Sequence, residues 1–201
     1  LTWTRRYGSL CARKGLCGVG WQTPADARLV MEENGAVIFH SGAPSASLFD
    51  RLPDQTPIME AIGGAVISLK GEYYQVRTIE GFTYQFGKPA GDTTDLPVER
   101  ISDDTGNSLS FTRDENGLCR IESSGAVIAV RSQDSLIHAM QLVIDGEEPK
   151  TLVSYHYTED GELLAAVDPL GASNTFTYED RRMTSHTDRN GLGFHFRYDE
   201  T

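Results

Sequence analysis

The chain has 201 residues, of which 39% are hydrophobic and 20 are glycine, and its formal net charge at pH 7 is −11. The length suffices for one large domain or two small ones. The acidity argues against partners that carry phosphate, so we expect this segment to bind neither nucleic acid nor an anionic membrane. No run of 18 apolar residues occurs, which argues against a transmembrane helix.

Two local structures are compatible with residues 23–35. A helix is possible, because Thr23-Pro24 supplies a favourable N-cap residue followed by a favourable first residue. A strand is also possible, because side chains alternate over residues 27–32 and Asn34-Gly35 is a strong hairpin signal. We favour the strand, which fits its neighbours better, and keep the helix as the alternative. Residues 57–62 pose the same question over a shorter stretch.

Turn signals followed by β-branched runs recur through the middle of the chain. Three copies of Gly-Ala-Val-Ile begin at Gly35, Gly64 and Gly125. Residues 103–114 match residues 188–199 almost position for position. With strands of roughly five or six residues, this pattern predicts on the order of 14 to 18 antiparallel strands.

The most regular pattern lies in residues 151–201. Asp168 and Asp188 are 20 residues apart, as are Tyr178 and Tyr198, while Tyr157 precedes Tyr178 by 21. Such a period is typical of stacked units that cannot bury their apolar faces alone. Aspartate, asparagine, proline and glycine predict the turns, and aromatic residues at alternate positions predict strands. The predicted structural repeat positions are Tyr157, Asp160, Gly161, Asp168, Pro169, Gly171, Tyr178, Asp188, Asn190, Gly191, Tyr198 and Asp199.

These patterns predict an all-β fold of repeated antiparallel hairpins in a strongly curved sheet. We expect residues 1–150 to form an irregular N-terminal portion of this sheet and residues 151–201 to form its regular repeats. Both portions would belong to one continuous domain, and we expect the chain to be a piece of a longer protein.

We expect no catalytic, cofactor-binding or metal site. The acidic pairs Asp103/Asp104 and Glu159/Asp160 could be posed as a general acid and base, but both lie in turn sequences. The stretch Asp188–Gly191 resembles the start of a calcium loop without its downstream glutamate. Five histidines lack metal-ligand spacing and suggest structural roles: His40, His138, His156, His186 and His195.

Cysteine and aromatic residues each leave an alternative open. The three cysteines, Cys11, Cys17 and Cys119, are odd in number and predict thiols, although a Cys11–Cys17 bridge is conceivable. Aromatic residues on alternate strand positions could stack on sugars, but they more often pack across strands and fix the register.

The repeat, with its Tyr198-Asp199 pair, resembles the Rhs/YD-repeat family. Residues 3–9 and 18–21 are similar to the N-terminal segment of bacterial Rhs proteins. This resemblance implies a hollow β-shell, or cocoon, that encloses the C-terminal toxin of a bacterial polymorphic toxin, and the chain would form the N-terminal part of its core. It also implies delivery by type VI secretion or another contact-dependent route, from the bacterial cytoplasm into a target cell. The family's self-cleavage motif is incomplete, because Ala172 stands where leucine is needed.

We therefore expect a non-enzymatic scaffold that encapsulates and delivers a toxin. Its partners would be the rest of the shell and the toxin, with a secretion spike protein and a chaperone as further candidates. Open sheet edges would let the isolated segment self-associate. The alternative is a carbohydrate- or protein-binding repeat module that uses its aromatic ladders, and a more distant one is a hydrolase that uses turn carboxylates.

Overall fold

The computed structural model describes residues 1–43 and 46–199, and this part of the chain is almost entirely β-structure. It contains 21 strands, five of which have only two residues, so there are more strands than the sequence predicts. The strands pair antiparallel, which confirms the all-β prediction. The helical structure of the described residues is a single 3-10 turn, η1 (Pro24–Asp26), and no helix there could cross a membrane.

The first of two compact units comprises Leu1–Thr4, Thr23–Thr112 and Ile121–Gly125. Its long strand β12 pairs with β5 through its first residues and with β11 and β13 through its last. The strands of this unit are β5 (Arg28–Met31), β6 (Val37–His40), β7 (Ala46–Phe49), β8 (Ile58–Met59), β9 (Val66–Lys70), β10 (Tyr73–Arg77), β11 (Thr83–Gly87), β12 (Asp95–Ser102) and parts of β13 (Ser108–Asp114) and β14 (Gly117–Ser123).

The alternative over residues 23–35 is decided in favour of the strand. Thr23 caps η1, because its backbone N–H and hydroxyl both donate to Asp26 Oδ2, at 2.7 and 2.6 Å. The chain then leaves the 3-10 turn directly into β5, which pairs with β6 after a turn at Glu32–Ala36. Thr23 is therefore an N-cap residue, as the sequence suggests, but the structure that follows it is one 3-10 turn rather than an α-helix. The segment at 57–62 likewise contains β8 rather than a helix.

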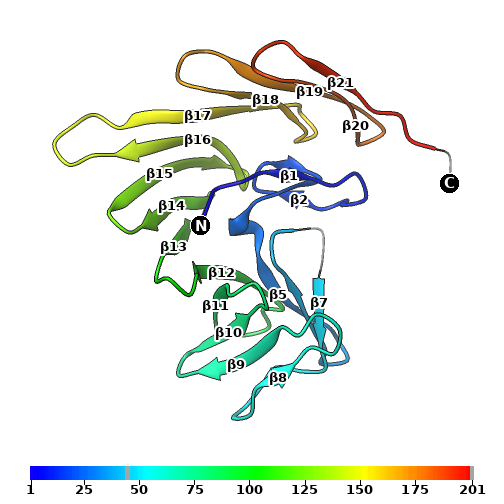
Figure 1. The fold of residues 1–201 in the computed structure, drawn as a ribbon, viewed down its shortest axis with the longest axis vertical. Helices are drawn as coiled ribbons and strands as arrows, with labels where there is room; N and C mark the ends of the chain where they lie inside the picture. Colours follow the sequence, from blue (N-terminus) through cyan, green and yellow to red (C-terminus); the bar gives the residue numbers. More distant parts are fainter. Residues whose placement is uncertain (44–45, 200–201) are drawn as a thin grey trace. The chain divides into compact units, whose positions relative to one another are not determined.

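The second compact unit comprises Arg5–Gln22, Arg113–Arg120 and Ala126–Thr201. Neighbouring strands from β15 to β21 pair antiparallel in chain order, and Figure 1 shows them side by side. The strands of this unit are the remaining parts of β13 and β14 together with β1 (Arg6–Tyr7), β2 (Lys14–Gly15), β3 (Gly18–Val19), β4 (Trp21–Gln22), β15 (Ala126–Gln133), β16 (Leu136–Val143), β17 (Lys150–Tyr157), β18 (Leu163–Val167), β19 (Ser173–Glu179), β20 (Arg182–Thr187) and β21 (Gly193–His195).

A single five-residue turn recurs at six places in the two units. In each, the first residue's N–H donates to the carbonyl of the fifth, and the N–H of a glycine at the fourth donates to the carbonyl of the first. That glycine has φ between 80° and 90°, the left-handed conformation that glycine adopts without strain. The turns span residues 32–36, 78–82, 103–107, 158–162, 168–172 and 188–192.

Two other connections in the second unit are tight two-residue turns. Asp134-Ser135 and Asp180-Arg181 all have positive φ, as a type I′ hairpin requires. The twenty-residue period of the sequence thus corresponds to two strands with their two connections. Turns one period apart are neighbours, since Arg189 Nη1 lies 4.0 Å from Asp168 Oδ2.

Candidate functional site: repeat tyrosines and an N-terminal strap

The repeat aspartates serve the turns. Asp168 Oδ1 accepts the backbone N–H groups of Leu170 and Ala172, at 2.9 and 3.0 Å. Asp188 Oδ1 accepts those of Asn190 and Leu192 in the same way, at 2.8 and 2.9 Å. These carboxylates therefore satisfy backbone donors that a tight turn leaves unpaired.

The turn at residues 158–162 uses a different residue for the same purpose. Its first position is Thr158, whose hydroxyl accepts the N–H of Glu162 at 3.0 Å. Asp160 occupies the third position and is exposed, and Gly161 occupies the fourth. Asp168 and Asp188 are thus equivalent in three dimensions, whereas Asp160 is not their counterpart.

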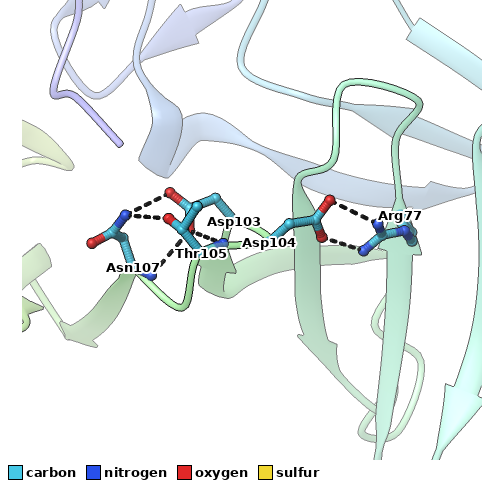
Figure 2. A network of polar contacts seen from close by, with 5 residues as sticks. All are labelled: Arg77, Asp103, Asp104, Thr105 and Asn107. Carbon is cyan, nitrogen blue, oxygen red and sulfur yellow. Dashed lines mark hydrogen bonds and ion pairs between the residues drawn. The ribbon is translucent and has the colours of Figure 1, made fainter.

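The Asp103 turn in the first unit has the most complete set of hydrogen bonds (Figure 2). Asp103 Oδ1 accepts from the backbone N–H groups of Thr105 and Asn107, both at 3.0 Å, and from the Thr105 hydroxyl at 2.8 Å. Asn107 Nδ2 donates to Asp103 Oδ2 at 2.9 Å. These bonds, of which that from the Asn107 side chain contributes most, lower the pKa of Asp103 to about 2.

Asp104 points to a different partner. Its carboxylate forms a two-point ion pair with the Arg77 guanidinium, at 2.8 and 2.9 Å (Figure 2). The hydrogen bond that Arg77 donates to this carboxylate raises the pKa of Arg77. Asp103 and Asp104 are therefore committed to separate structural contacts, and the second candidate pair, Glu159/Asp160, is exposed on a turn.

The repeat tyrosines share one contact. The hydroxyl of each donates to a backbone carbonyl near the start of the preceding strand: Tyr157 to Ile137 at 2.5 Å, Tyr178 to Leu163 at 3.0 Å and Tyr198 to Met183 at 2.8 Å. Tyr157 and Tyr178 therefore link β17 and β19 to the strand before each, and Tyr198, which follows β21, links the chain there to β20. We call these contacts the tyrosine–carbonyl links.

The register of strand pairing shifts directly before two of these tyrosines, Tyr157 and Tyr178. The register shifts between His156 and Tyr157 on β17, and between Thr177 and Tyr178 on β19. Such a bulge places an extra residue in one strand and redirects the side chains that follow it. His156 is exposed, whereas Tyr155 and Phe176, on the strand portions before the bulges, are 3% and 5% exposed.

Residues 5–22 lie against this sheet as a separate segment, which we call the strap. The strap folds back on itself through the pairs β1–β4 and β2–β3. Trp21 is 6% exposed and packs edge-on against Phe176, with ring centroids 4.9 Å apart. The Arg5 guanidinium lies over the rings of Trp21 and Tyr155, at 5.5 and 5.0 Å from their centroids. The strap therefore covers part of the aromatic face of the repeat strands.

Tyr178 joins the strap to the tyrosine–carbonyl links. Its hydroxyl accepts from Trp21 Nε1 at 2.9 Å while it donates to Leu163. Burial raises the pKa of Tyr178, so this hydroxyl remains protonated and able to donate throughout the physiological range. On the next strand, Tyr7 Oη accepts the N–H of Met183 at 2.9 Å and donates to the carbonyl of Arg181 at 3.2 Å.

The remaining candidates form no cluster in the described part of the chain. No group of three or more histidine, cysteine, aspartate or glutamate side chains there could hold a metal ion. The three cysteines are free thiols in the structure. His186 stacks between Phe176 and Phe194, with centroids 4.9 and 5.7 Å away, so part of the aromatic ladder is cross-strand packing.

Sequence reasoning placed the turns and the repeat tyrosines but missed the strap. The hydrogen bonds that Tyr7 and Trp21 of the strap make through their side chains join residues 157 to 176 positions apart, and no local pattern encodes such pairs. One signal was available, namely the two glycines of Gly18-Val-Gly-Trp21. A Cβ at Gly18 would lie 2.8 Å from the Gly161 carbonyl oxygen, and one at Gly20 would lie 2.7 Å from the Tyr7 ring.

These features define a class of protein, namely a β-hairpin repeat protein. In this class the aspartate and tyrosine side chains of the repeat form hydrogen bonds with backbone groups of the same chain. The comparisons with known proteins give more particular likenesses. Residues 1–49 match a family described as "Domain of unknown function (DUF6531)". Over 204 aligned residues the chain is 28% identical to Double-stranded DNA deaminase toxin A of Burkholderia cenocepacia (strain H111). The alignment covers 94% of this chain and 14% of that toxin, so the chain spans about one seventh of its relative.

We predict that Tyr178→Phe lowers the free energy of unfolding by about 2 kcal/mol, because it leaves the Trp21 indole N–H and the Leu163 carbonyl without their shared partner. Urea denaturation followed by circular dichroism measures the change. The matched control is Tyr73→Phe, at a tyrosine that is 41% exposed. Equal midpoints for the two variants would contradict the role assigned to the Tyr178 hydroxyl.

We predict that the carboxyl carbon of Asp103 titrates with a midpoint near pH 2 in an NMR titration of the folded chain. Because its pKa in the folded chain lies below its ordinary value of 3.8, ionised Asp103 stabilises the fold above pH 3.8. This contribution is lost as the pH falls towards 2. Asn107→Ala, which removes the strongest donor, should move the midpoint upward. An unchanged midpoint in that variant would show that Asn107 does not hold the carboxylate.

Proposed function

We propose that this chain is a non-enzymatic part of the wall of a hollow β-shell that encloses and delivers a toxin. One observation carries the proposal: a hairpin-repeat sheet aligns with one seventh of a protein whose name is that of a toxin. The match to DUF6531 over residues 1–49 is consistent with such a setting. The toxin would then be a part other than this sheet, and the Rhs/YD-repeat likeness of the sequence supports the same assignment.

The structural use of the polar residues supports a scaffold rather than an enzyme. Asp103, Asp168 and Asp188 accept turn N–H groups, and Asp104 pairs with Arg77. A catalytic carboxylate must be free to exchange a proton or attack a substrate. Hydrogen bonds from the Leu192 and Asn190 N–H groups lower the pKa of Asp188, which makes it a poorer base. We therefore propose that these residues have no catalytic role.

Sequestration is the mechanism that a wall of this kind would supply. A closed sheet separates its contents from the surroundings without chemistry, and closure also hides strand edges. The toxin inside would be released only after delivery to a target cell. The partners are accordingly the rest of the shell and the toxin cargo, with a secretion spike and a chaperone assisting delivery from the bacterial cytoplasm.

The binding-module alternative has less support from the contacts. Phe86 and Phe176 are 0% and 5% exposed, so they cannot offer a ring face to a sugar. Phe194 and Phe196 are 45% and 42% exposed and are the aromatic residues of the ladder best placed to meet a ligand. Their position at the last strand of the sheet equally suits packing against a further strand.

The shell proposal predicts that the full-length product protects its C-terminal domain. Limited proteolysis of the native full-length protein should leave a C-terminal toxin fragment intact, and mild denaturant that opens the wall should make the same fragment sensitive. The matched control is the C-terminal domain expressed alone, which should be cut under native conditions. Cleavage of that domain in the native full-length protein as fast as in the isolated one would contradict encapsulation.

We further propose that the isolated chain self-associates through β21. Phe194 on β21 and the flanking residues Leu192, Phe196 and Tyr198 are 38% to 59% exposed, and an uncovered strand edge pairs readily with another. Sedimentation velocity should show mass increasing with concentration, and Phe194→Lys should reduce it. A concentration-independent monomer would contradict this prediction.

A further inference from the structure

The strap touches the repeat sheet at successive strands. Its first contact is with β16, where the Ile137 N–H donates to the Leu16 carbonyl at 2.8 Å. The next is with the turn after β17, where the Val19 N–H donates to the Gly161 carbonyl at 3.2 Å. Trp21 then binds Tyr178 on β19, and Tyr7 binds Met183 on β20. One short segment therefore holds points from β16 to β20.

These contacts differ in kind from those within the sheet. A stacked repeat contacts only its neighbours, so its stability is a sum of nearest-neighbour terms and its end can fray one hairpin at a time. The strap adds bonds that bypass the neighbouring strands, because it is itself closed by the pairs Tyr7↔Trp21 and Lys14↔Val19. If one hairpin between β16 and β20 opens, the strap must also strain the contacts that it makes with the other strands of this group.

The strap is fitted closely enough to act in this way. Gly18 has φ of 107° and lies against the Gly161 carbonyl, where a Cβ would be only 2.8 Å from the oxygen. Trp21 and Tyr7 also contact each other, with ring centroids 5.5 Å apart. A segment bound through backbone atoms at this distance cannot slide along the sheet without losing its hydrogen bonds.

We propose that the strap is a staple that makes strands β16–β20 open and close as one cooperative body, with β21 outside it. The contacts described above for the strap reach Met183 on β20, whereas the side chains of β21 are exposed. This inference rests on the contacts of the second unit and does not depend on the proposed function. It also implies that the strap, although it is synthesised before these strands, cannot complete its docking until Met183 has been synthesised.

The four methionines of the chain offer a direct test. Met140 on β16 and Met183 on β20 lie near the two ends of the proposed body, whereas Met31 and Met59 lie in the first unit. The experiment is a methyl NMR spectrum of the full chain with labelled methionine, for the unmodified protein and for Trp21→Phe and Gly18→Ala. Gly146→Ala is the matched control, because Gly146 also has positive φ but has no atom within 4 Å of an added Cβ.

A staple predicts that Trp21→Phe and Gly18→Ala each shift or broaden the methyl signals of both Met140 and Met183. The signals of Met31 and Met59 should stay in place, and Gly146→Ala should leave all four unchanged. The proposal is overturned if Met140 or Met183 keeps its original signal in both strap variants. Equal movement of all four signals would also overturn it, because that result indicates general destabilisation.

Discussion

The structure depends on the need to satisfy backbone groups at the ends of short strands. A hairpin of the repeat is too small to bury its own apolar face, and its terminal carbonyls would lose hydrogen bonds if they were covered without a partner. The tyrosine–carbonyl links meet both needs at once. Each ring packs on the sheet, while its hydroxyl satisfies a carbonyl at the start of the preceding strand. The spacing of these tyrosines therefore follows from the geometry of two strands and two turns.

The strap applies the same principle over a longer distance. Its backbone and its aromatic side chains pair with groups of the repeat strands that would otherwise be exposed or unpaired, and Tyr178 receives both kinds of contact. The Tyr178 hydroxyl thus joins a contact within the repeat, to Leu163, with a contact to the strap, from Trp21. This arrangement suits a wall, in which strength must be shared among many weak units, better than a catalytic cleft, which needs polar groups kept free of structural partners.

Much of this arrangement could be predicted from the sequence because turns and strands have local signatures. Gly171 and Gly191 indicated left-handed turn positions, and Asp168 and Asp188 have the predicted turn role. Asp160 did not match them, because the hydroxyl of Thr158 serves the first position equally well. The position of the strap on the sheet could not be predicted. The Trp21 side chain forms its hydrogen bond with Tyr178 only after the repeat strands have folded. The scaffold role remains a proposal, because a turn aspartate and a catalytic one look alike in a sequence.

If the strap acts as proposed, the repeat hairpins are interdependent rather than separately stable. Residue-resolved native-state hydrogen exchange of the full chain tests this most directly. We predict that the slowest amides of strands β16 to β20 share one opening free energy, while those of β21 exchange faster. A stepwise series of opening free energies, falling from β16 to β20 one hairpin at a time, would contradict this interdependence.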